Sequence, residues 1–321
     1  MNIVVLYNDP DTDATVEDLD VLVQRDAVME ALQRQGHTAT PLGCTLNLQA
    51  AQQQLRELKP DIVFNLVEAL GGTDRLMSAA TLLLESMNIP FTGARTSAIL
   101  TTSNKPVAKQ RMRSAGIPTP DWRVTNSVIS DTPVQPCRWI VKPIWEHASL
   151  GMTDDAVIEV ASDSEVIAAL QSRSTATGRP HFAEQFVEGR EFNLSVLAGQ
   201  VLPPAEIDFS SFPVDKPRIV GHSAKWDADS FEYHQTPRSF DFSTSDSPLL
   251  EHLTRIAEQC WKVFELQGYA RVDFRVDSAG QPWVLEINAN PCLSPNAGFA
   301  AALDRAGICY EDAVRQIIED V

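Results

Sequence analysis

Two stretches that lie close together in the sequence, ARVDFRVD (270–277) and VLEINANP (284–291), decide the fold prediction. Polar and apolar residues alternate along both, so each is predicted to form a β-strand, and the turn residues at 278–280 predict a hairpin. Side chains two positions apart share one face of a strand. The hairpin can therefore bring four polar side chains together, namely Arg271, Asp273, Glu286 and Asn288.

Three of these side chains have the chemistry of a magnesium site. Asp273, Glu286 and Asn288 offer only oxygen atoms, which suit Mg²⁺ far better than zinc or copper. Carboxylate-bound Mg²⁺ usually accompanies nucleotide phosphates. A solvated polar strand face is the alternative interpretation, and apolar neighbours such as Val272 and Ile287 argue against it.

The charge balance limits the partners. The chain has 321 residues with 26 Lys and Arg against 43 Asp and Glu, a formal net charge of −17. Such a field repels phosphate backbones and anionic lipids, so we expect no nucleic-acid and no membrane partner. The stretch MNIVVLYNDPD (1–11) is acidic where a signal peptide is basic, and no apolar run approaches the roughly 20 residues of a spanning helix. We therefore expect a cytoplasmic location.

An acidic chain that binds polyphosphate needs cations at the binding site. Lys105 stands at the predicted start of a helix, where the helix dipole adds positive potential, and Lys142 ends a predicted strand. Ser149 lies in a polar, glycine-containing stretch at 145–155, predicted to be a mobile loop whose amides cover phosphates. Each feature alone is a weak signal. Their order ahead of the carboxylates favours a nucleotide site.

The segment HFAEQFVEGREFNLSV (181–196) can hold the rest of a nucleotide. An adenine ring needs apolar faces and backbone hydrogen-bonding groups, and ribose hydroxyls need an acceptor. The predicted strand end and the acid that follows it offer both, through Glu184, Gln185, Phe186, Val187 and Glu191. An ordinary edge strand followed by a turn at Gly189 is the alternative interpretation.

Elsewhere, short apolar runs alternate with helical patterns, which is typical of an α/β fold. Strands are predicted at 3–7, 61–66, 88–93, 138–142, 182–187, 191–198, 201–208, 270–276 and 282–288. Helices are predicted at 16–35, 74–87, 104–114, 163–172, 248–266, 297–305 and 310–319. The stretch 209–247 is predicted to be a long active-site loop with short strands. No GxGxxG motif follows the first strand, so a nicotinamide cofactor has no support.

The order of these motifs resembles the ATP-grasp superfamily. It runs through TTSNKPVAK, GIPTP, VKP, SLGMT, EQFVEGREF, SAKW, RVDF and LEINANP. NIPFTG (88–93) and NANPCLSPN (288–296) resemble the D-alanine:D-alanine ligase-like branch more narrowly. The resemblance implies an α/β fold, with a Rossmann-like domain at 1–94 followed by a two-lobed α+β ATP-grasp part. Its smaller lobe is predicted at 95–188, and its larger lobe, with the metal and catalytic site, at 189–321.

The resemblance also implies the roles of the ATP-binding residues. Lys105 and Lys142 are expected to hold the phosphates, and Ser149 to lie in the loop that closes over them. The adenine ring is expected among Glu184, Gln185, Phe186 and Val187. Glu191 is expected at the ribose.

The reaction follows from the same resemblance. Asp273, Glu286 and Asn288 are implied ligands of a pair of Mg²⁺ ions, with Mn²⁺ as a substitute. Lys225 is implied to approach the γ-phosphate, and Arg271 to stabilise charge on the phosphorylated carboxylate. ATP then phosphorylates a carboxylate, an amine attacks the acyl phosphate, and ADP and phosphate leave.

The substrate half departs from the family pattern. YNDPDTDATVEDLD (7–20) and FNLVEALGGTDR (64–75) replace the usual Gly-Gly-x-Ser-x-Glu stretch and the usual His-Gly followed by Gly-Glu-Asp-Gly. Cys292 stands where the family has a glycine beside the oxyanion hole. The candidates for binding a substrate ammonium are Glu17, Asp20 and Glu68, with solvated or helix-start acids as the alternative interpretation.

We therefore predict an ADP-forming carboxylate–amine ligase that joins two amino acids or a related small pair, an activity associated with cell-wall biogenesis. The expected partners are a small-molecule carboxylate and an amine, and the family resemblance suggests a homodimer. Three alternatives stay open: a ligase with a different amide or dipeptide product, a non-catalytic nucleotide-binding regulatory protein, and a phosphoryl transferase acting on a hydroxyl.

Overall fold

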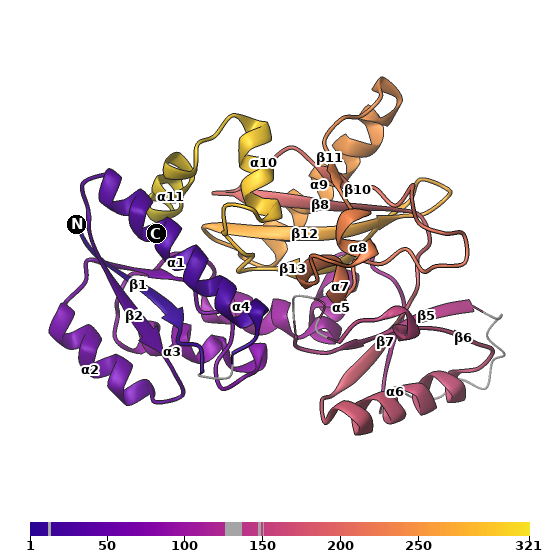
Figure 1. The fold of residues 1–321 in the computed structure, drawn as a ribbon, viewed down its shortest axis with the longest axis horizontal. Helices are drawn as coiled ribbons and strands as arrows, with labels where there is room; N and C mark the ends of the chain where they lie inside the picture. Colours follow the sequence, from indigo (N-terminus) through magenta and orange to yellow (C-terminus); the bar gives the residue numbers. More distant parts are fainter. Residues whose placement is uncertain (12–13, 126–136, 147–148, 150) are drawn as a thin grey trace.

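The structure is a computed structural model that describes residues 1–11, 14–125, 137–146, 149 and 151–321. Its strands form three sheets with helices packed around them (Figure 1). The first sheet is parallel, in the order β2-β1-β3. This part of the chain contains β1 (Asn2–Asn8), α1 (Val16–Arg34), β2 (Thr38–Cys44), α2 (Leu48–Leu58), β3 (Ile62–Asn65), the 3-10 turn η1 (Asp74–Leu76) and α3 (Ser78–Ser86).

The predicted strands at 3–7 and 61–66 and the predicted helices at 16–35 and 74–87 are confirmed in outline. The strand predicted at 88–93 is wrong, because Phe91 forms only an isolated parallel bridge with Val63. Sequence periodicity also missed β2 and α2. The β2 sequence, TATPLGC, has no apolar run, and its proline is tolerated because β2 is an edge strand.

The second sheet is antiparallel, in the order β4-β7-β5-β6. Helix α6 covers it with Val166, Ile167 and Leu170, which pack on Trp139 and Val141. The Asn104 side chain accepts a hydrogen bond from the Val107 N–H, which confirms the predicted helix cap. This part contains α4 (Thr96–Ser103), α5 (Lys105–Ser114), β4 (Trp122–Val124), β5 (Cys137–Pro143), the 3-10 turn η2 (Asp154–Ala156), β6 (Val157–Val160), α6 (Asp163–Thr177) and β7 (His181–Gln185).

The third sheet has six antiparallel strands, in the order β11-β10-β8-β12-β13, with β9 beside β8. Its strands are β8 (Arg190–Leu197), β9 (Gln200–Val201), β10 (Ala205–Ile207), β11 (Arg238–Ser239), β12 (Tyr269–Val276) and β13 (Pro282–Asn288). The predicted strand at 201–208 is split in two, because Pro203 and Pro204 donate no ladder hydrogen bond. Its helical partners are α9 (Ser247–Val263), α10 (Gly298–Ala306) and α11 (Tyr310–Glu319).

The long segment at 209–247 has less strand than predicted. It holds α7 (His222–Trp226), α8 (Phe231–His234), the strand β11 and the 3-10 turn η3 (Thr244–Asp246). Phe209, Phe212 and Ile207 form a small apolar cluster, with Phe212 and Phe231 in ring contact at 5.6 Å. This cluster holds the segment against the large sheet.

The large sheet has one apolar and one polar face. Phe192, Leu194, Val272 and Phe274 belong to a core cluster that includes residues of α4, α5 and α9. A register shift between Asp273 and Phe274 leaves Leu285 of β13 without a cross-strand partner. Strict alternation would put Val284 and Glu286 on the same face, but this β-bulge buries Val284 in the core and turns Glu286 to the polar face.

The first sheet docks onto the C-terminal part of the chain through helices. Val28 and Leu32 of α1 pack in one cluster with Val314 and Ile317 of α11 (Figure 1). The Tyr269 hydroxyl donates to Asn290 Oδ1 at 2.5 Å, and Asn290 Nδ2 donates to the Val67 carbonyl at 3.1 Å. The predicted domain boundaries at 94/95 and 188/189 fall between the three sheets and stay predictions.

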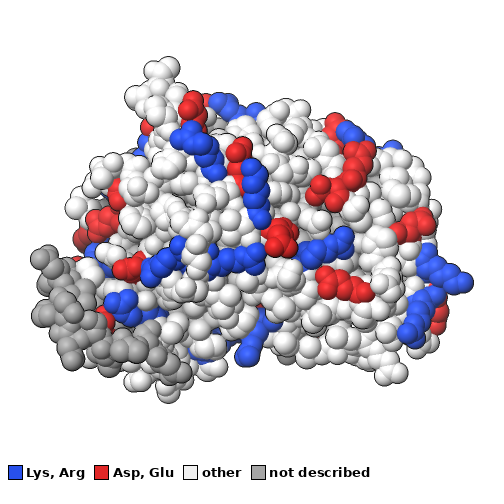
Figure 2. Space-filling model, turned by 180° about the vertical axis from the view of Figure 1, so that it is seen from behind, with Lys and Arg blue, Asp and Glu red and all other residues white. Residues whose placement is uncertain are grey.

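Charges of both signs are interspersed on the face seen in Figure 2, despite the net charge of −17. Ion pairs such as Arg190–Glu206, at 2.7 Å, compensate part of the surface charge. No helix in the described ranges is long and apolar enough to cross a membrane.

A glycine fixes the link between the second and third sheets, and we expect Gly189→Ala to destabilise the protein. Gly189 has a φ of +143°, and a Cβ there would lie 1.9 Å from the Val276 carbonyl oxygen. Overpacking and backbone strain together should lower the free energy of unfolding by roughly 2–6 kcal/mol in urea titrations. Gly280→Ala is the control, because Gly280 has a φ of +79° and no atom within 4 Å of such a Cβ. A loss no larger than the roughly 1–2 kcal/mol expected for this control would contradict the steric argument.

Candidate active site

The polar face of the large sheet brings the predicted metal ligands together. Asp273 of β12 pairs directly with Glu286 of β13, and Arg271 pairs with Asn288. The predicted hairpin is therefore confirmed, and the bulge at Leu285 completes the alignment. Two carboxylates that lie directly opposite each other on paired strands repel one another unless cations compensate their charge.

Cations and donors surround this carboxylate pair. The Arg271 guanidinium donates to Asp273 through Nε at 2.7 Å and Nη2 at 2.8 Å. Asn193 Nδ2 of β8 donates to Asp273 Oδ1 at 2.7 Å. Lys105 Nζ lies 3.7 Å from Glu286 Oε2. A divalent ion bound here could replace part of this charge compensation.

The donor chemistry fits magnesium. Asp273, Glu286 and Asn288 supply carboxylate and amide oxygens, the ligand types that Mg²⁺ prefers. Across the described ranges, no group of three or more His, Cys, Asp or Glu side chains has the arrangement of a metal site. A site on this face would therefore have two carboxylates and would complete its coordination with the amide, phosphate and water.

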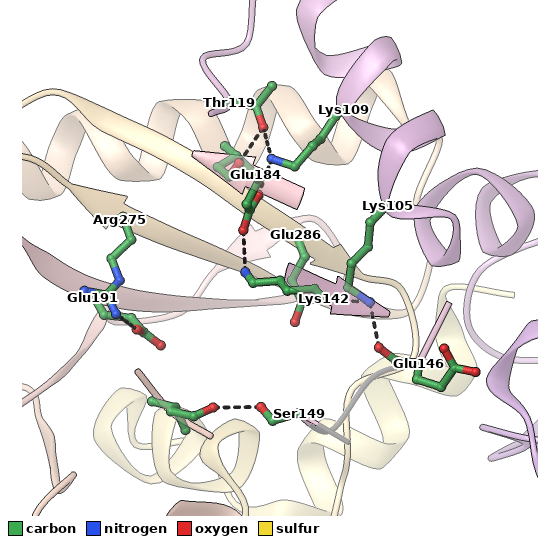
Figure 3. A network of polar contacts seen from close by, with 12 residues as sticks. Lys105, Lys109, Thr119, Lys142, Glu146, Ser149, Glu184, Glu191, Arg275 and Glu286 are labelled. Carbon is green, nitrogen blue, oxygen red and sulfur yellow. Dashed lines mark hydrogen bonds and ion pairs between the residues drawn. The ribbon is translucent and has the colours of Figure 1, made fainter. Parts of the chain in front are cut away.

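Lys105 and Lys142 approach the carboxylates from the second part of the chain. Lys105 is the first residue of α5, is 6% exposed, and donates through Nζ to the Glu146 carbonyl at 2.6 Å. Burial alone would lower the pKa of Lys142, but Glu184 and then Glu286 raise it. The structure thus brings both predicted lysines to one place (Figure 3).

A buried charge cluster lies beside Lys142 (Figure 3). Glu184 is 1% exposed and is paired with Lys142 and with Lys109, whose Nζ lies 2.6 Å from Glu184 Oε2. Lys109 also donates to Thr119 Oγ1 at 2.8 Å. Burial alone would raise the pKa of Glu184, and the two lysines lower it. Glu184 therefore holds Lys142 in place, a role that the predicted adenine contact of Glu184 did not include.

The linker after β7 presents its residues differently. Gln185 is exposed, and its N–H donates to the Asp121 carbonyl at 2.8 Å. The Phe186 N–H donates to the Arg138 carbonyl at 2.8 Å, and its ring centre lies 4.9 Å from the Arg138 guanidinium and 5.6 Å from that of Arg275. Val187 is half-buried, and within the described residues no backbone hydrogen bond engages it. A purine edge could therefore bond to the Val187 backbone without displacing a hydrogen bond among the described residues.

Glu191 lies on the same face as Asp273, at the start of β8. Its Oε2 lies 2.7 Å from Nη2 of Arg275, the cross-strand partner of Glu191 on β12. Burial raises the pKa of Glu191, and Arg275 opposes this shift.

Ser149 comes from a loop and Lys225 from the short helix α7. Ser149 Oγ donates to the Val220 carbonyl at 2.7 Å, in the long segment that carries Lys225. Residues 147, 148 and 150 of the predicted 145–155 loop lie outside the described residues. Burial and then Arg271 lower the pKa of Lys225. No hydrogen bond or ion pair engages the Lys225 ammonium within the described part of the chain, so this cation is available for a ligand.

The predicted substrate acids line the junction between α1 and the C-terminal motif. Asp20 accepts from Cys292 Sγ and from Ser294 Oγ, both at 2.9 Å, so its carboxylate fastens α1 to this motif. Glu17 lies 3.0 Å from His222 Nε2 of the long segment. Cys292 is half-buried, and burial raises the pKa of its thiol well above the usual range.

Glu68 is the third of these acids. Its Oε1 accepts from Gln24 Nε2 at 3.0 Å, and Gln24 Oε1 accepts from the Leu293 N–H at 2.9 Å. Burial and the neighbouring Asp20 raise the pKa of Glu68 to about 8. A neutral carboxyl at pH 7 would ionise only when a substrate cation reaches it.

Comparisons with known proteins identify the family of this chain. A protein-family model described as "D-ala D-ala ligase C-terminus" matches residues 112–319. The chain belongs to this family. The D-alanine–D-alanine ligase of Laribacter hongkongensis is 30% identical over 93% of this chain and 90% of its own length. That of Synechococcus sp. (strain JA-3-3Ab) is 28% identical over 100% and 93%.

Solved structures agree on the fold. A D-alanine–D-alanine ligase from Bacillus anthracis complexed with ATP has a TM-score of 0.68 and 21% identity, covering 99% of this chain and 95% of that one. The expected ATP-grasp fold class and family resemblance are therefore confirmed. With the family comes the activity class, so this D-ala D-ala ligase family member is an ATP-dependent, ADP-forming ligase.

Sequence reasoning missed several polar residues of this family member's site. Lys109 lies four positions after Lys105 on α5, so helical spacing could have placed both on one face. Asn193 and Arg275 lie two positions from Glu191 and Asp273, so strand alternation could have included them.

Arg238 carried no such signal, because it is an isolated arginine in a long loop. On β11 it continues the cross-strand row of Ile207 and Glu191, which puts it on the polar face. Its Nε lies 3.1 Å from where a Cβ on Gly298 would be, and the residue is exposed overall. Partial desolvation of the guanidinium, followed by the charge of Arg271, lowers its pKa. No hydrogen bond or ion pair compensates this guanidinium among the residues that the structure describes.

The raised pKa of Glu68 predicts a pH-dependent stability. Because the folded state holds the proton up to about pH 8, the stabilisation by Glu68 is full below its ordinary value of 4.5 and is lost as the pH rises through 8. Relative to Glu68→Gln, wild-type stability should fall by up to about 4 kcal/mol between pH 5 and 8 in urea titrations. Glu57→Gln, on the exposed side of α2, should track the wild type. Parallel curves for wild type and Glu68→Gln would contradict the assignment.

Proposed function

We propose that this ligase joins a small carboxylate to an amine with Mg·ATP and through an acyl phosphate. The observation that carries this proposal is the approach of Lys105, 3.7 Å from Glu286, and of Lys142 to the carboxylate pair. The proposed phosphate-binding cations, on α5 and β5, thus face the magnesium-type ligands on the large sheet. A nucleotide triphosphate with its metal has the charge pattern that completes this arrangement.

The proposed ATP site extends from these lysines to the linker. Lys105 and Lys142 bind the phosphates, and Ser149 belongs to the loop that covers them. Adenine lies by Phe186 and bonds to the free backbone of Val187, while Gln185 lines the edge of the site. Glu184 orients Lys142 through their ion pair, and Glu191 accepts hydrogen bonds from the ribose hydroxyls.

The reacting groups lie at the other end of the same face. Asp273, Glu286 and Asn288 would hold a pair of Mg²⁺ ions, or Mn²⁺ in their place, which neutralise phosphate charge when bound. Lys225 binds the transferred phosphoryl group, because this half-buried lysine has no hydrogen bond or ion pair within the described part of the chain. Arg271 stabilises the charge that develops on the phosphorylated carboxyl.

The substrates belong between this face and the first sheet. Relatives named D-alanine–D-alanine ligase make D-alanine the first substrate to test. Glu17 and Glu68 are the proposed partners of a substrate ammonium, whereas Asp20 acts through its bonds to Cys292 and Ser294. Arg238 is proposed to bind a substrate carboxylate, since this guanidinium faces Arg271 without a counter-charge.

We propose the cellular setting by the same family reasoning. The ligase works in the cytoplasm as a homodimer, and its product enters cell-wall biogenesis. It takes small-molecule partners and binds neither nucleic acid nor membrane, as its net charge of −17 suggests.

The first test is phosphate release from Mg·ATP with single amino acids and pairs, including D-alanine, followed by product masses. We expect release with at least one carboxylate–amine pair, a product lighter than the two substrates by one water, and a hydroxamate when hydroxylamine is present. Release without a hydroxamate would favour phosphoryl transfer to a hydroxyl.

Glu286→Ala is the matched variant for this assay. It should abolish turnover, since one of the two carboxylate ligands is gone, while the fold persists because Glu286 is partly exposed. Binding of Mg·ATP without turnover by the wild-type protein across the panel would contradict ligation and favour the regulatory alternative.

Arg238→Gln tests the substrate half with the best substrate pair from the panel. Loss of a charged hydrogen bond should raise the KM for one substrate about tenfold or more, with the KM for ATP unchanged. The amide of that substrate should already be poor for the wild-type enzyme and lose little further with Arg238→Gln. An equal loss for acid and amide would contradict recognition of a carboxylate.

A further inference from the structure

Arg275 is a buried cation on the nucleotide face to which the ATP scheme gives no task. Its side chain is 5% exposed, and Nη2 lies 2.7 Å from Glu191 Oε2. The two residues are direct cross-strand partners on β12 and β8. The register of the sheet thus fixes this pair, as Figure 3 shows.

The same guanidinium joins segments that are distant in sequence. Arg275 Nη1 donates to the Gly189 carbonyl at 3.1 Å, and Nη2 donates to the carbonyl of Arg218. The rings of Phe186 and Phe209 lie 5.6 Å and 5.4 Å from its Cζ. The linker, β8 and the long segment therefore meet at one side chain.

This geometry restricts how Glu191 can move. Arg275 occupies Oε2 on the sheet side, so the other carboxylate oxygen and the remaining lone pairs stay available for a ligand. The planar guanidinium serves Glu191 and two carbonyls in fixed directions, and a lysine ammonium would not reproduce this fork. The side chain of Glu191 is thus prepared before any ligand binds.

We propose that Arg275 is a positioning residue for the nucleotide ribose, which aims the Glu191 carboxylate at the sugar hydroxyls and so makes the site prefer ribonucleotides over deoxyribonucleotides. This inference rests on the proposed function, in which Glu191 lies at the ribose. Arg275 touches neither the sugar nor the phosphates in this scheme. Its effect on binding passes through Glu191.

The test compares dissociation constants of Mg·ATP, Mg·2′-deoxy-ATP and Mg·3′-deoxy-ATP for the wild type and Arg275→Met, measured by titration calorimetry. The wild type should bind ATP about tenfold or more tightly than a deoxy analogue, because a hydroxyl bonded to a carboxylate is lost. In Arg275→Met the affinity for ATP should fall to that of the analogues, with little change for the analogues themselves. Turnover should show a raised KM for ATP and a nearly unchanged kcat.

Two further variants keep the result interpretable. Glu191→Gln should lose the same discrimination, and the double variant with Arg275→Met should lose no more than either single variant, since one interaction is removed twice. Arg275→Lys keeps the charge without the fork and should restore the discrimination only in part. These comparisons remain decisive even where Arg275→Met folds poorly.

Arg190→Met is the matched control. Arg190 also lies on β8, and it forms ion pairs with Glu206 at 2.7 Å and with Asp246 at 2.5 Å. Because it is the neighbour of Glu191 in sequence, it faces the other side of the sheet. Its loss removes a comparable ion pair close by. The preference for ATP over its deoxy analogues should persist.

Two results would overturn the inference while leaving ATP binding intact. Equal weakening of ATP and both analogues by Arg275→Met would make Arg275 a merely structural residue. A wild type that binds all three nucleotides equally would remove Glu191 from the ribose. Failure of the wild type to bind any of them would instead overturn the proposed function, and this inference with it.

Discussion

Repulsion between two carboxylates is the constraint on which the rest of this structure depends. Asp273 and Glu286 face each other on neighbouring strands, in a chain that already carries a net charge of −17. Such a pair persists only where cations compensate it. Arg271 supplies one from the same strand, and Lys105 supplies another from α5. The carboxylate pair therefore has to be built where two parts of the chain meet.

Charge compensation by ion pairs recurs among the residues around the carboxylate pair. Lys142 is held by Glu184, which is held in turn by Lys109, and Glu191 is held by Arg275. These pairs are buried, so the loss of one partner leaves a charge in a medium of low dielectric constant. In the proposed function this face is preorganised for a ligand that has both phosphates and cations. Lys225 and Arg238 have no hydrogen bond or ion pair within the part of the chain that the structure describes, and the proposal assigns further negative charge of the ligands to them.

The hairpin and its four polar residues could be predicted, because alternation is a local property of each strand. Much of the helix pattern could be predicted for the same reason, including the Asn104 cap. The edge strand β2 could not, since its residues carry no apolar run, and 88–93 resembled a strand without pairing as one. Lys109 and Arg275 also went unnoticed, because their importance comes from partners more than 70 residues away in sequence.

The sequence by itself determined the family, the order of the nucleotide motifs and the oxygen-rich ligand set, since each is written in short stretches with fixed spacing. Only the tertiary structure decided which face each motif serves. The bulge at Leu285 turns Glu286 toward Asp273, and the cross-strand register pairs Arg275 with Glu191. Because α1 docks against the C-terminal motif, Asp20 accepts a hydrogen bond from Cys292 and connects the two. Such outcomes depend on strand register and on packing between distant segments, which no local pattern encodes.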